Sequence, residues 1–254
     1  MDQSSQDDAN VGNWVSRRIL ITTAVLAAGF GGMALIWRPF LVLGLFFLLA
    51  FAYFVYAHRL FSPAGSNLQE RIRNQIFDYF IWDGKGKAID IGCGNGQLVI
   101  QLAKMYPHAE ITGIDFWGSM WDYSKEMCEE IARRESVAGN TVFQKASASR
   151  LPYEDGAFDA AVSNFVFHEV ADTKDKREVL REALRVVRKG GSFCFQDLFL
   201  AEAIYGDIAV LLETVRNWDV ESVSFVNTTE ADFIPSVLKL PFMVGKIGIL
   251  HGVK

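Results

Sequence analysis

A short glycine-rich string is the part of this sequence best suited to hold a ligand. It reads DIGCGNG over residues 90–96 and follows an apolar run that predicts a β-strand. Glycines at alternate positions, Gly92, Gly94 and Gly96, permit backbone conformations that other residues avoid and let a ligand approach the backbone. The helix expected after the string adds unpaired N–H donors from its first turn. The string therefore predicts a ligand-binding loop at the end of a strand.

The glycine spacing separates two classes of cofactor. The dinucleotide fingerprint G-x-G-x-x-G would need a glycine at position 97, where the sequence has Gln97. This counts against a nicotinamide-dependent oxidoreductase. Asp115 ends the next predicted strand, and its carboxylate can accept hydrogen bonds from both hydroxyls of a ribose. Phe116, which follows it, offers an apolar surface for an adenine ring.

Two titratable side chains follow later predicted strands. His168 comes after the run 158–163, and Asp197 comes after the run 192–196. Because the ordinary pKa of histidine lies near 6.5, His168 can take up a proton at neutral pH. His168 is the first candidate for a general base and Asp197 the second. The alternative is that His168 caps a helix or lines a pocket without transferring a proton.

The elements that must position these residues alternate between strand and helix. Short apolar runs predict strands at 88–91, 110–114, 141–144, 158–163, 192–196 and 247–253, and amphipathic runs predict helices at 68–80, 97–105, 119–138 and 174–187. Such alternation predicts an α/β fold, a Rossmann-like doubly wound sheet that is mainly parallel with helices on both faces. Ligands bind such sheets beyond the carboxyl ends of the strands.

The string DIGCGNG resembles motif I of the class I S-adenosyl-L-methionine-dependent methyltransferases, in particular domains of the type 11/25 kind. Three further segments are similar to this family. They read ASASRLPY at 146–153, FDAAVSN at 158–164 and LRVVRKGG at 184–191. The resemblance runs from about residue 70 to residue 200. It implies a methyltransferase that uses S-adenosyl-L-methionine as its cofactor.

The resemblance also implies which residues contact the cofactor. They are Asp90, Gly92, Cys93, Gly94, Gly96, Asp115, Phe116, Ser147, Ala148 and Asn164. Ser147 departs from the family pattern, which has an aspartate there for the adenine amino group. A serine can still form the hydrogen bond, but without the help of a charge. This departure is the one feature that favours an alternative function, a non-catalytic cofactor-binding scaffold.

Two uncharged apolar runs, 19–37 and 40–57, precede this domain. As helices they would be about 27–28 Å long, close to the roughly 30 Å hydrocarbon core of a bilayer. They predict a hairpin of two transmembrane helices. A hairpin that dips into one leaflet is one alternative. A twin-arginine export signal at Arg17 and Arg18 is another, although no cleavage site follows it.

The predicted hairpin divides the chain into four parts. They are a polar tail at 1–18, the hairpin at 19–57, a linker at 58–67 and a methyltransferase domain at 68–254. Cationic residues flank the hairpin on the side of both chain termini, and they are Arg17, Arg18, Arg59, Arg71 and Arg73. An excess of Lys and Arg marks the cytoplasmic side. We therefore expect an integral membrane protein with its catalytic domain in the cytoplasm.

The membrane segment also bears on the acceptor. A pocket held beside the bilayer favours a small, apolar or lipid-like acceptor, and the apolar segment 199–225 is a candidate lid over that pocket. A protein acceptor is an alternative. The Asn/Asp-Pro-Pro-Tyr/Phe signature of enzymes that methylate adenine or glutamine is replaced by SNFV at 163–166.

Composition excludes other classes of partner. The 254 residues carry a net charge of −5 without a long cationic run, which disfavours binding to nucleic acid. The three cysteines, Cys93, Cys128 and Cys194, form no CxxC pair. Neither a disulfide framework nor a metal site is therefore expected.

Overall fold

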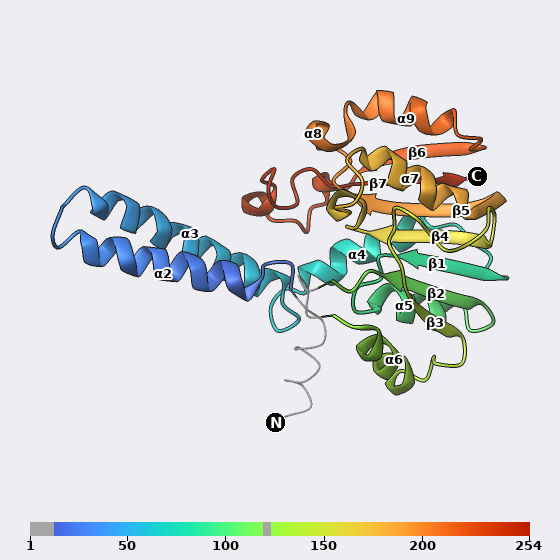
Figure 1. Ribbon diagram of the computed structural model, residues 1–254, viewed down its shortest axis with the longest axis horizontal. Coiled ribbons are helices and arrows are strands. Elements are labelled where there is room, and N and C mark those ends of the chain that lie inside the picture. Colours follow the sequence, from blue (N-terminus) through green and yellow to red (C-terminus); the bar gives the residue numbers. More distant parts are fainter. Residues whose placement is uncertain (1–12, 119–122) are drawn as a thin grey trace. The chain divides into compact units, whose positions relative to one another are not determined.

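The computed structural model of the protein describes residues 13–118 and 123–254. The chain divides into two compact units, with the boundary between Ile72 and Arg73. Figure 1 shows a helical hairpin in the first unit and an α/β sheet in the second.

The hairpin consists of α2 (Arg17–Met33) and α3 (Phe40–Phe61), which run antiparallel beside each other (Figure 1). Helix α2 begins at Arg17 because the Ser16 hydroxyl accepts a hydrogen bond from the Ile19 amide. The helices come close where Gly44 faces the backbone of Gly31, since a Cβ at Gly44 would lie 3.1 Å from the Gly31 nitrogen. Small residues thus let the two backbones approach each other.

The observed helices differ from the predicted hairpin. The first helix ends at Met33 and not at Trp37, because residues 34–39 form the turn. Among the described residues one helix, α3, is both long and apolar enough to cross a membrane. The prediction of two transmembrane helices is therefore not supported. Helix α3 also continues to Phe61, so part of the predicted linker is helical.

Part of the predicted polar tail lies against the end of α3. The Asn13 side-chain amide donates to the His58 carbonyl at 2.9 Å, and His58 Nδ1 lies 2.8 Å from the Val15 carbonyl. The Trp14 and Phe61 rings are 5.4 Å apart. Residues 13–16 are therefore anchored within the first unit, residues 17 and 18 begin α2, and residues 1–12 lie outside the described part of the chain.

In the second unit, the described strands form one seven-stranded sheet in the order β3-β2-β1-β4-β5-β7-β6. Strands β1 to β5 are parallel, and β7 runs antiparallel between β5 and β6. The strands are β1 (Lys87–Ile91), β2 (Glu110–Asp115), β3 (Thr141–Lys145), β4 (Phe158–Asn164), β5 (Val187–Asp197), β6 (Ser222–Asn227) and β7 (Gly248–Val253). This confirms the predicted mainly parallel α/β sheet.

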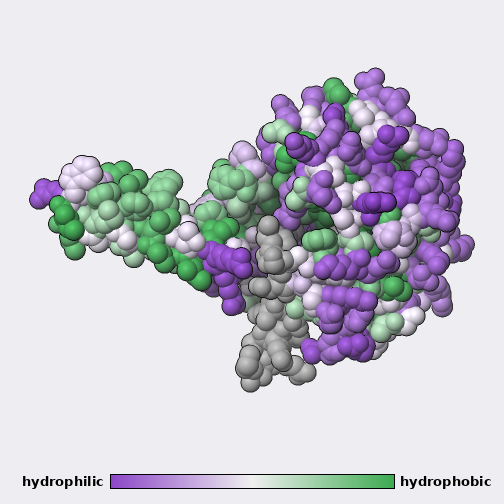
Figure 2. Space-filling model, in the orientation of Figure 1, coloured by the Kyte–Doolittle hydropathy of each residue, from purple (hydrophilic) through white to green (hydrophobic). Residues whose placement is uncertain are grey.

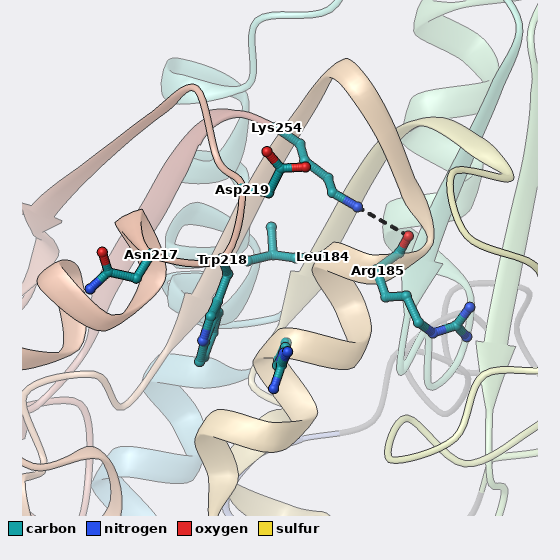
Figure 3. A pocket seen from close by; sticks show the side chains of 7 residues that line it. Leu184, Arg185, Asn217, Trp218, Asp219 and Lys254 are labelled. Carbon is teal, nitrogen blue, oxygen red and sulfur yellow. Dashed lines mark hydrogen bonds between the residues drawn. The ribbon is translucent and has the colours of Figure 1, made fainter.

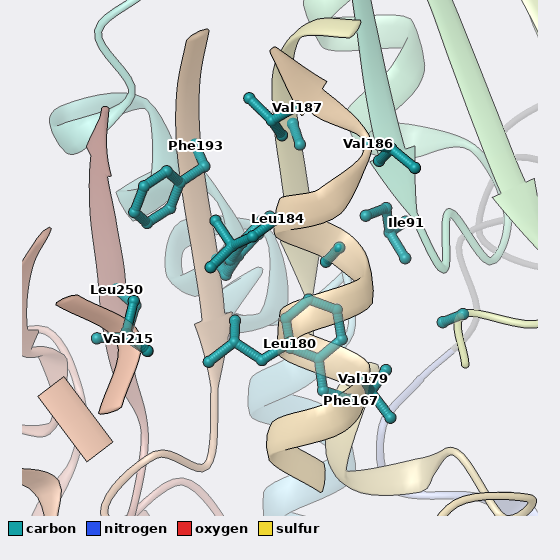
Figure 4. Close-up of a cluster of buried hydrophobic side chains, with 14 of the residues drawn as sticks. Ile91, Phe167, Val179, Leu180, Leu184, Val186, Val187, Phe193, Val215 and Leu250 are labelled. Atoms are coloured by element: carbon teal, nitrogen blue, oxygen red, sulfur yellow. The ribbon is translucent and has the colours of Figure 1, made fainter. Parts of the chain in front are cut away.

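Helices cover both faces of the sheet (Figure 1). One face packs against α4 (Leu68–Tyr79), α5 (Gln97–Met105) and α6 (Lys125–Arg134). The other packs against α7 (Lys176–Arg185), α8 (Glu202–Tyr205) and α9 (Ile208–Arg216). Figure 4 shows the second core, where Leu180 and Leu184 of α7 lie among Phe167, Phe193 and Leu250.

The boundaries of α6 and β5 depart from the prediction. Helix α6 begins at Lys125 and not at residue 119, because Ser124 is extended and its hydroxyl caps the Met127 amide at 3.2 Å. Residues 119–122 lie outside the described part of the chain. Strand β5 begins at Val187 and not at residue 192, so residues 187–191 belong to the strand. The sixth strand, β6, was not predicted.

The predicted lid segment 199–225 is part of the fold. It contains α8, α9 and the start of β6, and the side chains of Phe199, Leu211 and Val215 are buried in the core (0–1% exposed). The segment therefore packs on the sheet near β6 and β7 as part of the hydrophobic core and does not form a separate lid.

Adjacent residues of α9 allow a matched test of this placement. Leu211 is buried and Val210 is 55% exposed. We expect Leu211→Ala to lower the free energy of unfolding by about 2–4 kcal/mol, because it leaves a cavity in the core. Val210→Ala should change it by less than about 1 kcal/mol. Urea denaturation measures both, and equal small effects would show that α9 is not part of the core.

Candidate cofactor and active site

The carboxyl ends of the parallel strands bring the predicted site residues to one edge of the sheet. Strand β1 pairs with β2 on one side and with β4 on the other, with Asp90 opposite both Gly113 and Val162. Strand β4 pairs with β5, with Asn164 opposite Gln196. Ligands bind at such an edge where neighbouring connections diverge, as they do on the two sides of β1.

The glycine loop needs its glycines. Gly92, Gly94 and Gly96 have φ values of +77°, +55° and +79°, a region that other residues rarely adopt. A Cβ at Gly92 would also collide with the side chain of Val166. The loop then leads into α5 at Gln97, as predicted.

Four amide groups of this loop donate to acceptors within the protein. The Gly92 and Cys93 amides both donate to the Ile114 carbonyl at 2.8 Å, and the Gly96 amide donates to the Cys93 carbonyl at 2.8 Å. The Gly94 amide donates to Asp115 Oδ2 at 2.9 Å. These glycine amides are therefore not free to donate to a ligand. Their role is to let the chain turn tightly and to keep space above it open.

Asp115 joins the glycine loop to the segment after β2. Its Oδ2 accepts from Gly94, its Oδ1 accepts from the Trp117 amide at 2.7 Å, and the Trp117 indole donates to the Gly94 carbonyl at 2.8 Å. Each carboxylate oxygen has a second lone pair, so two ribose hydroxyls can still bind. Phe116 is 64% exposed, and its ring lies 5.4 Å from Lys145 Nζ. It leaves an aromatic face accessible.

Asp90 is a buried carboxylic acid at this edge of the sheet, and its pKa is shifted. It is 1% exposed, and neither carboxyl oxygen has a hydrogen-bond partner among the described residues. Burial raises the pKa of Asp90 to about 8, the charge of Asp115 adds to the increase, and Arg73 opposes it. Asp90 is therefore mostly neutral at pH 7.

The burial of Arg73 was not predicted from the sequence. Arg73 was expected only as a cationic flank of the hairpin, but its side chain is buried on α4 (6% exposed). The sequence offers one weak indication that this arginine is buried. Arg73 lies next to Ile72 and three residues before Ile76 on the apolar side of an amphipathic helix.

The two candidate catalytic residues form a hydrogen-bonded pair. His168 Nδ1 lies 2.6 Å from Asp197 Oδ1. Asp197 is fully buried, and it also accepts from the amides of Phe167 at 2.8 Å and Leu198 at 2.6 Å. The carboxylate is thereby fixed in place, and it holds one edge of the imidazole. Tyr205 is buried against Asp197, and both burial and that charge raise the pKa of its phenol.

This arrangement suits His168 for proton uptake. Burial alone would lower its pKa, but the hydrogen bond and charge of Asp197, with a contribution from Glu169, raise the pKa above 6.5. With Nδ1 donating to Asp197, Nε2 carries the lone pair. Nε2 lies 3.8 Å from Glu169 Oε1, and the imidazole side chain is 18% exposed, so one edge of the ring remains accessible.

Ser147 lies beside a carboxylate, that of Asp172. Its hydroxyl donates to Asp172 Oδ2 at 2.9 Å, and the Ser149 hydroxyl donates to the same oxygen at 2.7 Å. The charge missing at position 147 is therefore supplied from the loop after β4. Ala148, beside it, is buried.

Two other predicted cofactor residues differ in what they present. Asn164 is at the end of β4, and its side-chain oxygen is buried without a hydrogen-bond partner among the described residues. Cys93 turns its side chain into the core beside Cys128, and burial raises its thiol pKa well above the ordinary value. Only the backbone of Cys93 is available to a ligand.

A hollow of about 290 Å³ lies elsewhere, beside the start of β5 (Figure 3). Its walls include Arg181, Arg185, Trp218 and Lys254. The guanidinium of Arg185 is already engaged by Glu182 and Asp155, and its carbonyl accepts from Lys254 Nζ. None of the predicted site residues lines this hollow. It does not contribute to the candidate site.

Comparison with known proteins identifies the family. Residues 83–232, more than half of the chain, match the family of the methyltransferase domain. The chain belongs to this family. The match and the fold agree with the methyltransferase class and the S-adenosyl-L-methionine cofactor expected from the sequence. Within the described residues no group of three or more His, Cys, Asp or Glu side chains is placed to hold a metal ion.

Two curated relatives resemble the central part of the domain. The ubiquinone/menaquinone biosynthesis C-methyltransferase of Desulfotalea psychrophila is 32% identical over 42% of this chain and 39% of the relative. The 27-O-demethylrifamycin SV methyltransferase of Amycolatopsis mediterranei is 32% identical over 47% of this chain and 41% of the relative. The match thus spans less than half the length of each relative.

Solved structures share the fold. The geranyl diphosphate C-methyltransferase of Streptomyces coelicolor, solved with S-adenosyl-L-homocysteine, has a TM-score of 0.55 at 12% identity. The superposition covers 74% of this chain and 80% of that one. At this identity the likeness concerns the fold alone.

The buried state of Asp90 predicts how stability depends on pH. Its pKa is 3.8 when exposed and about 8 in the folded protein. Between these values the folded state retains a proton that the unfolded state has lost. Stability therefore falls as pH rises through this window, by up to about 1.4 kcal/mol per pH unit.

Asp90→Asn removes this proton without removing much volume, so the fall with pH should become shallower. Urea denaturation of both proteins between pH 5 and pH 8 measures the difference, with Asp78→Asn, an exposed aspartate on α4, as the control. Parallel curves for the wild type and Asp90→Asn would contradict the buried neutral state.

Proposed function

We propose that this protein transfers the methyl group of S-adenosyl-L-methionine to a small, apolar or lipid-like acceptor at the cytoplasmic face of a membrane. The observation that carries the catalytic part is the meeting of two arrangements at one edge of the sheet. One is the glycine loop with Asp90 and Asp115, and the other is the His168–Asp197 pair.

The residues at this edge fit the cofactor. Asp115 has lone pairs for the ribose hydroxyls, Phe116 offers a face for adenine, and the oxygens of Asp90 have no hydrogen-bond partner in the described part of the chain. Ser147 beside Asp172 provides an acceptor for the adenine amino group. Gly92, Gly94, Gly96 and the backbone of Cys93 supply the turn, while Ala148 and Asn164 border the same edge. When bound, the cofactor supplies a methyl group on a sulfonium, which is already activated for transfer.

His168 is the proposed base. The protein mainly aligns the reactants for an in-line displacement, but a hydroxyl or carbon acid must also lose a proton. With Nδ1 donating to Asp197, Nε2 of His168 can take this proton, and the carboxylate of Asp197 stabilises the imidazolium that forms. Asp197 is therefore a positioning residue that acts through His168.

The names of the relatives support a small-molecule acceptor. They concern a quinone in one case and a rifamycin in the other. We propose the same broad class for this chain.

Methyl transfer can be tested directly with the full chain. The protein is incubated with methyl-labelled S-adenosyl-L-methionine and a total membrane lipid extract, and we expect label in the lipid fraction. His168→Asn should lower kcat by about 10²-fold or more while cofactor affinity stays within about twofold, because the base does not hold the cofactor. His108→Asn, which changes an exposed histidine, is the control. Cofactor binding without product would identify a scaffold, and label confined to water-soluble products would exclude a lipid-like acceptor.

The pH profile tests the role of Asp197. The base must be neutral, so activity should rise with pH through the pKa of His168, above 6.5. Asp197→Asn removes the charge that raises this pKa, and the rising limb should move to lower pH. An unchanged limb would show that His168 does not act as the base.

The hairpin is the proposed membrane anchor. Its apolar side chains face outward, as the green surface of this unit in Figure 2 shows. Leu45 and Leu49 of α3 are 51% and 71% exposed, and few residues of this helix are buried. At 22 residues α3 is about 33 Å long, enough to span a bilayer, whereas α2 has 17 residues and reaches about 26 Å. We propose that the hairpin enters the bilayer from the cytoplasmic side.

Vesicle flotation tests the anchor. The full chain should float with phosphatidylcholine–phosphatidylglycerol vesicles. The double variant Leu45→Lys, Leu49→Lys should lower the vesicle partition coefficient by at least about 100-fold, because lysine is costly in the hydrocarbon core. Ile81→Lys, at an apolar position of the second unit that is 81% exposed, is the matched control. Equal flotation of both variants would contradict insertion of the hairpin.

A further inference from the structure

The connection between β6 and β7 leaves the sheet at the edge that holds the candidate active site. Strand β7 pairs with both of its neighbours so that Gly248 lies opposite Asp197 of β5 and Asn227 of β6. The connection, residues 228–247, therefore emerges beside Asp197, which is hydrogen-bonded to His168. Figure 1 shows this connection at the end of β7 away from the C-terminus.

Internal contacts give the connection a fixed shape. The side chains of Ile234, Leu238 and Val244 are buried (0–3% exposed). The Leu200 amide, in the segment after β5, donates to the Lys246 carbonyl at 3.1 Å. The connection is therefore packed onto the second unit and held beside the end of β5.

A tight turn at residues 240–245 of this connection presents an aromatic side chain outward. The amides of Met243 and Gly245 both donate to the Leu240 carbonyl, at 2.9 and 3.0 Å. Phe242 lies at the tip of this turn and is 67% exposed. Because apolar surface gains free energy when it leaves water, an aromatic ring held outward by a hydrogen-bonded turn suits contact with an apolar phase.

The same part of the chain is cationic, unlike the protein as a whole. The net charge of the protein is −5, yet residues 233–254 contain no Asp or Glu. Lys239 and Lys246 flank the turn, and its two ends are close, since a Cβ at Gly245 would collide with the Lys239 carbonyl. Neither lysine forms an ion pair with a described residue. Two cationic residues thus lie at the base of the turn and Phe242 at its tip.

We infer that this turn is a second membrane contact, in which Phe242 enters the headgroup boundary of a bilayer and the flanking lysines bind anionic phospholipid headgroups. The inference rests on the proposed function for the presence of a membrane. It does not depend on the hairpin, because the residues that carry it all belong to the second unit. Aromatic side chains favour the membrane–water interface, and lysines near an anionic bilayer surface are attracted to it.

The size of the surface favours a bilayer over a protein partner. A stable protein interface buries roughly 800 Å² on each partner, far more than one aromatic tip and two lysines offer. The position of the turn also has a consequence for the acceptor. Contact there places the carboxyl edge of the sheet against the bilayer, so that an acceptor dissolved in the lipid reaches His168 without crossing water.

A fluorescent probe on the turn tests this contact in the full chain. Phe242→Cys is labelled with a thiol-reactive NBD dye, since the native cysteines are buried. On addition of phosphatidylcholine–phosphatidylglycerol vesicles, the emission should shift to shorter wavelength, and spin labels on the lipid acyl chains should quench it. Ile81→Cys is the matched control, because this position is 81% exposed and precedes β1 at the opposite edge of the sheet. Its emission should not change.

Vesicle partitioning measures the contribution of the lysines. The hairpin double variant of the flotation test is used as the background, so that the hairpin does not dominate binding. In this background Lys239→Gln with Lys246→Gln should lower the partition coefficient by about 10- to 30-fold, because each lysine beside an anionic surface adds about a factor of five. Lys85→Gln with Lys87→Gln removes the same charge near the opposite edge and should change it by less than about twofold.

The possible failures are distinguishable. If the probe at position 242 behaves like the probe at position 81 while the chain floats with vesicles, the contact at the turn is overturned and the hairpin anchor stands. If the chain does not float and neither probe responds, the membrane location in the proposed function fails as well. Equal losses from the two lysine pairs would overturn the role of Lys239 and Lys246. A signal at position 242 that rises with protein concentration without vesicles would identify contact between two copies of the chain and overturn the bilayer as the partner.

Discussion

The carbonyl of Ile114 fixes the site by accepting hydrogen bonds from two consecutive amides, those of Gly92 and Cys93. It ties the end of β1 to the end of β2 and forces the chain into a left-handed turn that glycine adopts without a Cβ clash. The Gly94 amide is then positioned to donate to Asp115. Because these contacts satisfy the loop internally, it acts as a rigid floor, and recognition of a ligand passes to the side chains around it.

Two buried aspartates at this edge differ in how well their carboxyl groups are hydrogen-bonded. Asp197 is buried and well supplied with donors, so it is a fixed support for His168. Asp90 is equally buried and has no donor among the described residues. The first arrangement suits a group whose geometry must not change during catalysis. The second suits a group whose contacts are completed only when a ligand arrives. The same edge of the sheet thus combines a preorganised base with an incomplete binding site.

Features that depend on local pattern could be predicted from the sequence. The apolar periodicity of 97–105 gave the bounds of α5, and the strands β1 to β4 were placed within one residue. The apolar pattern did not predict the start of a helix where a capping residue determines it. The charged amphipathic run suggested a helix from residue 119, but the extended Ser124 begins it later. Strand β6 was missed because its residues are only partly buried and pair with β7 alone.

Contacts between residues far apart in the sequence could not be predicted, although some of the residues could be named as candidates. His168 and Asp197 were each named as candidates, but their hydrogen bond joins residues 29 positions apart in the sequence. Asp172 could not be connected with Ser147 across 25 positions. Arg73 carried the weakest signal, because an arginine after an apolar hairpin fits a membrane flank as well as a buried site. Its burial against the sheet distinguishes the two.

The most direct test of the central claim is a crystal structure of the full chain with S-adenosyl-L-homocysteine. We expect the ligand at the carboxyl edge of the sheet, with its amino-acid end beside Asp90, its ribose on Asp115 and its sulfur facing His168. Ligand density in the hollow beside Trp218, or at the carboxyl edge with the amino-acid end pointing away from Asp90, would contradict the proposed cofactor site.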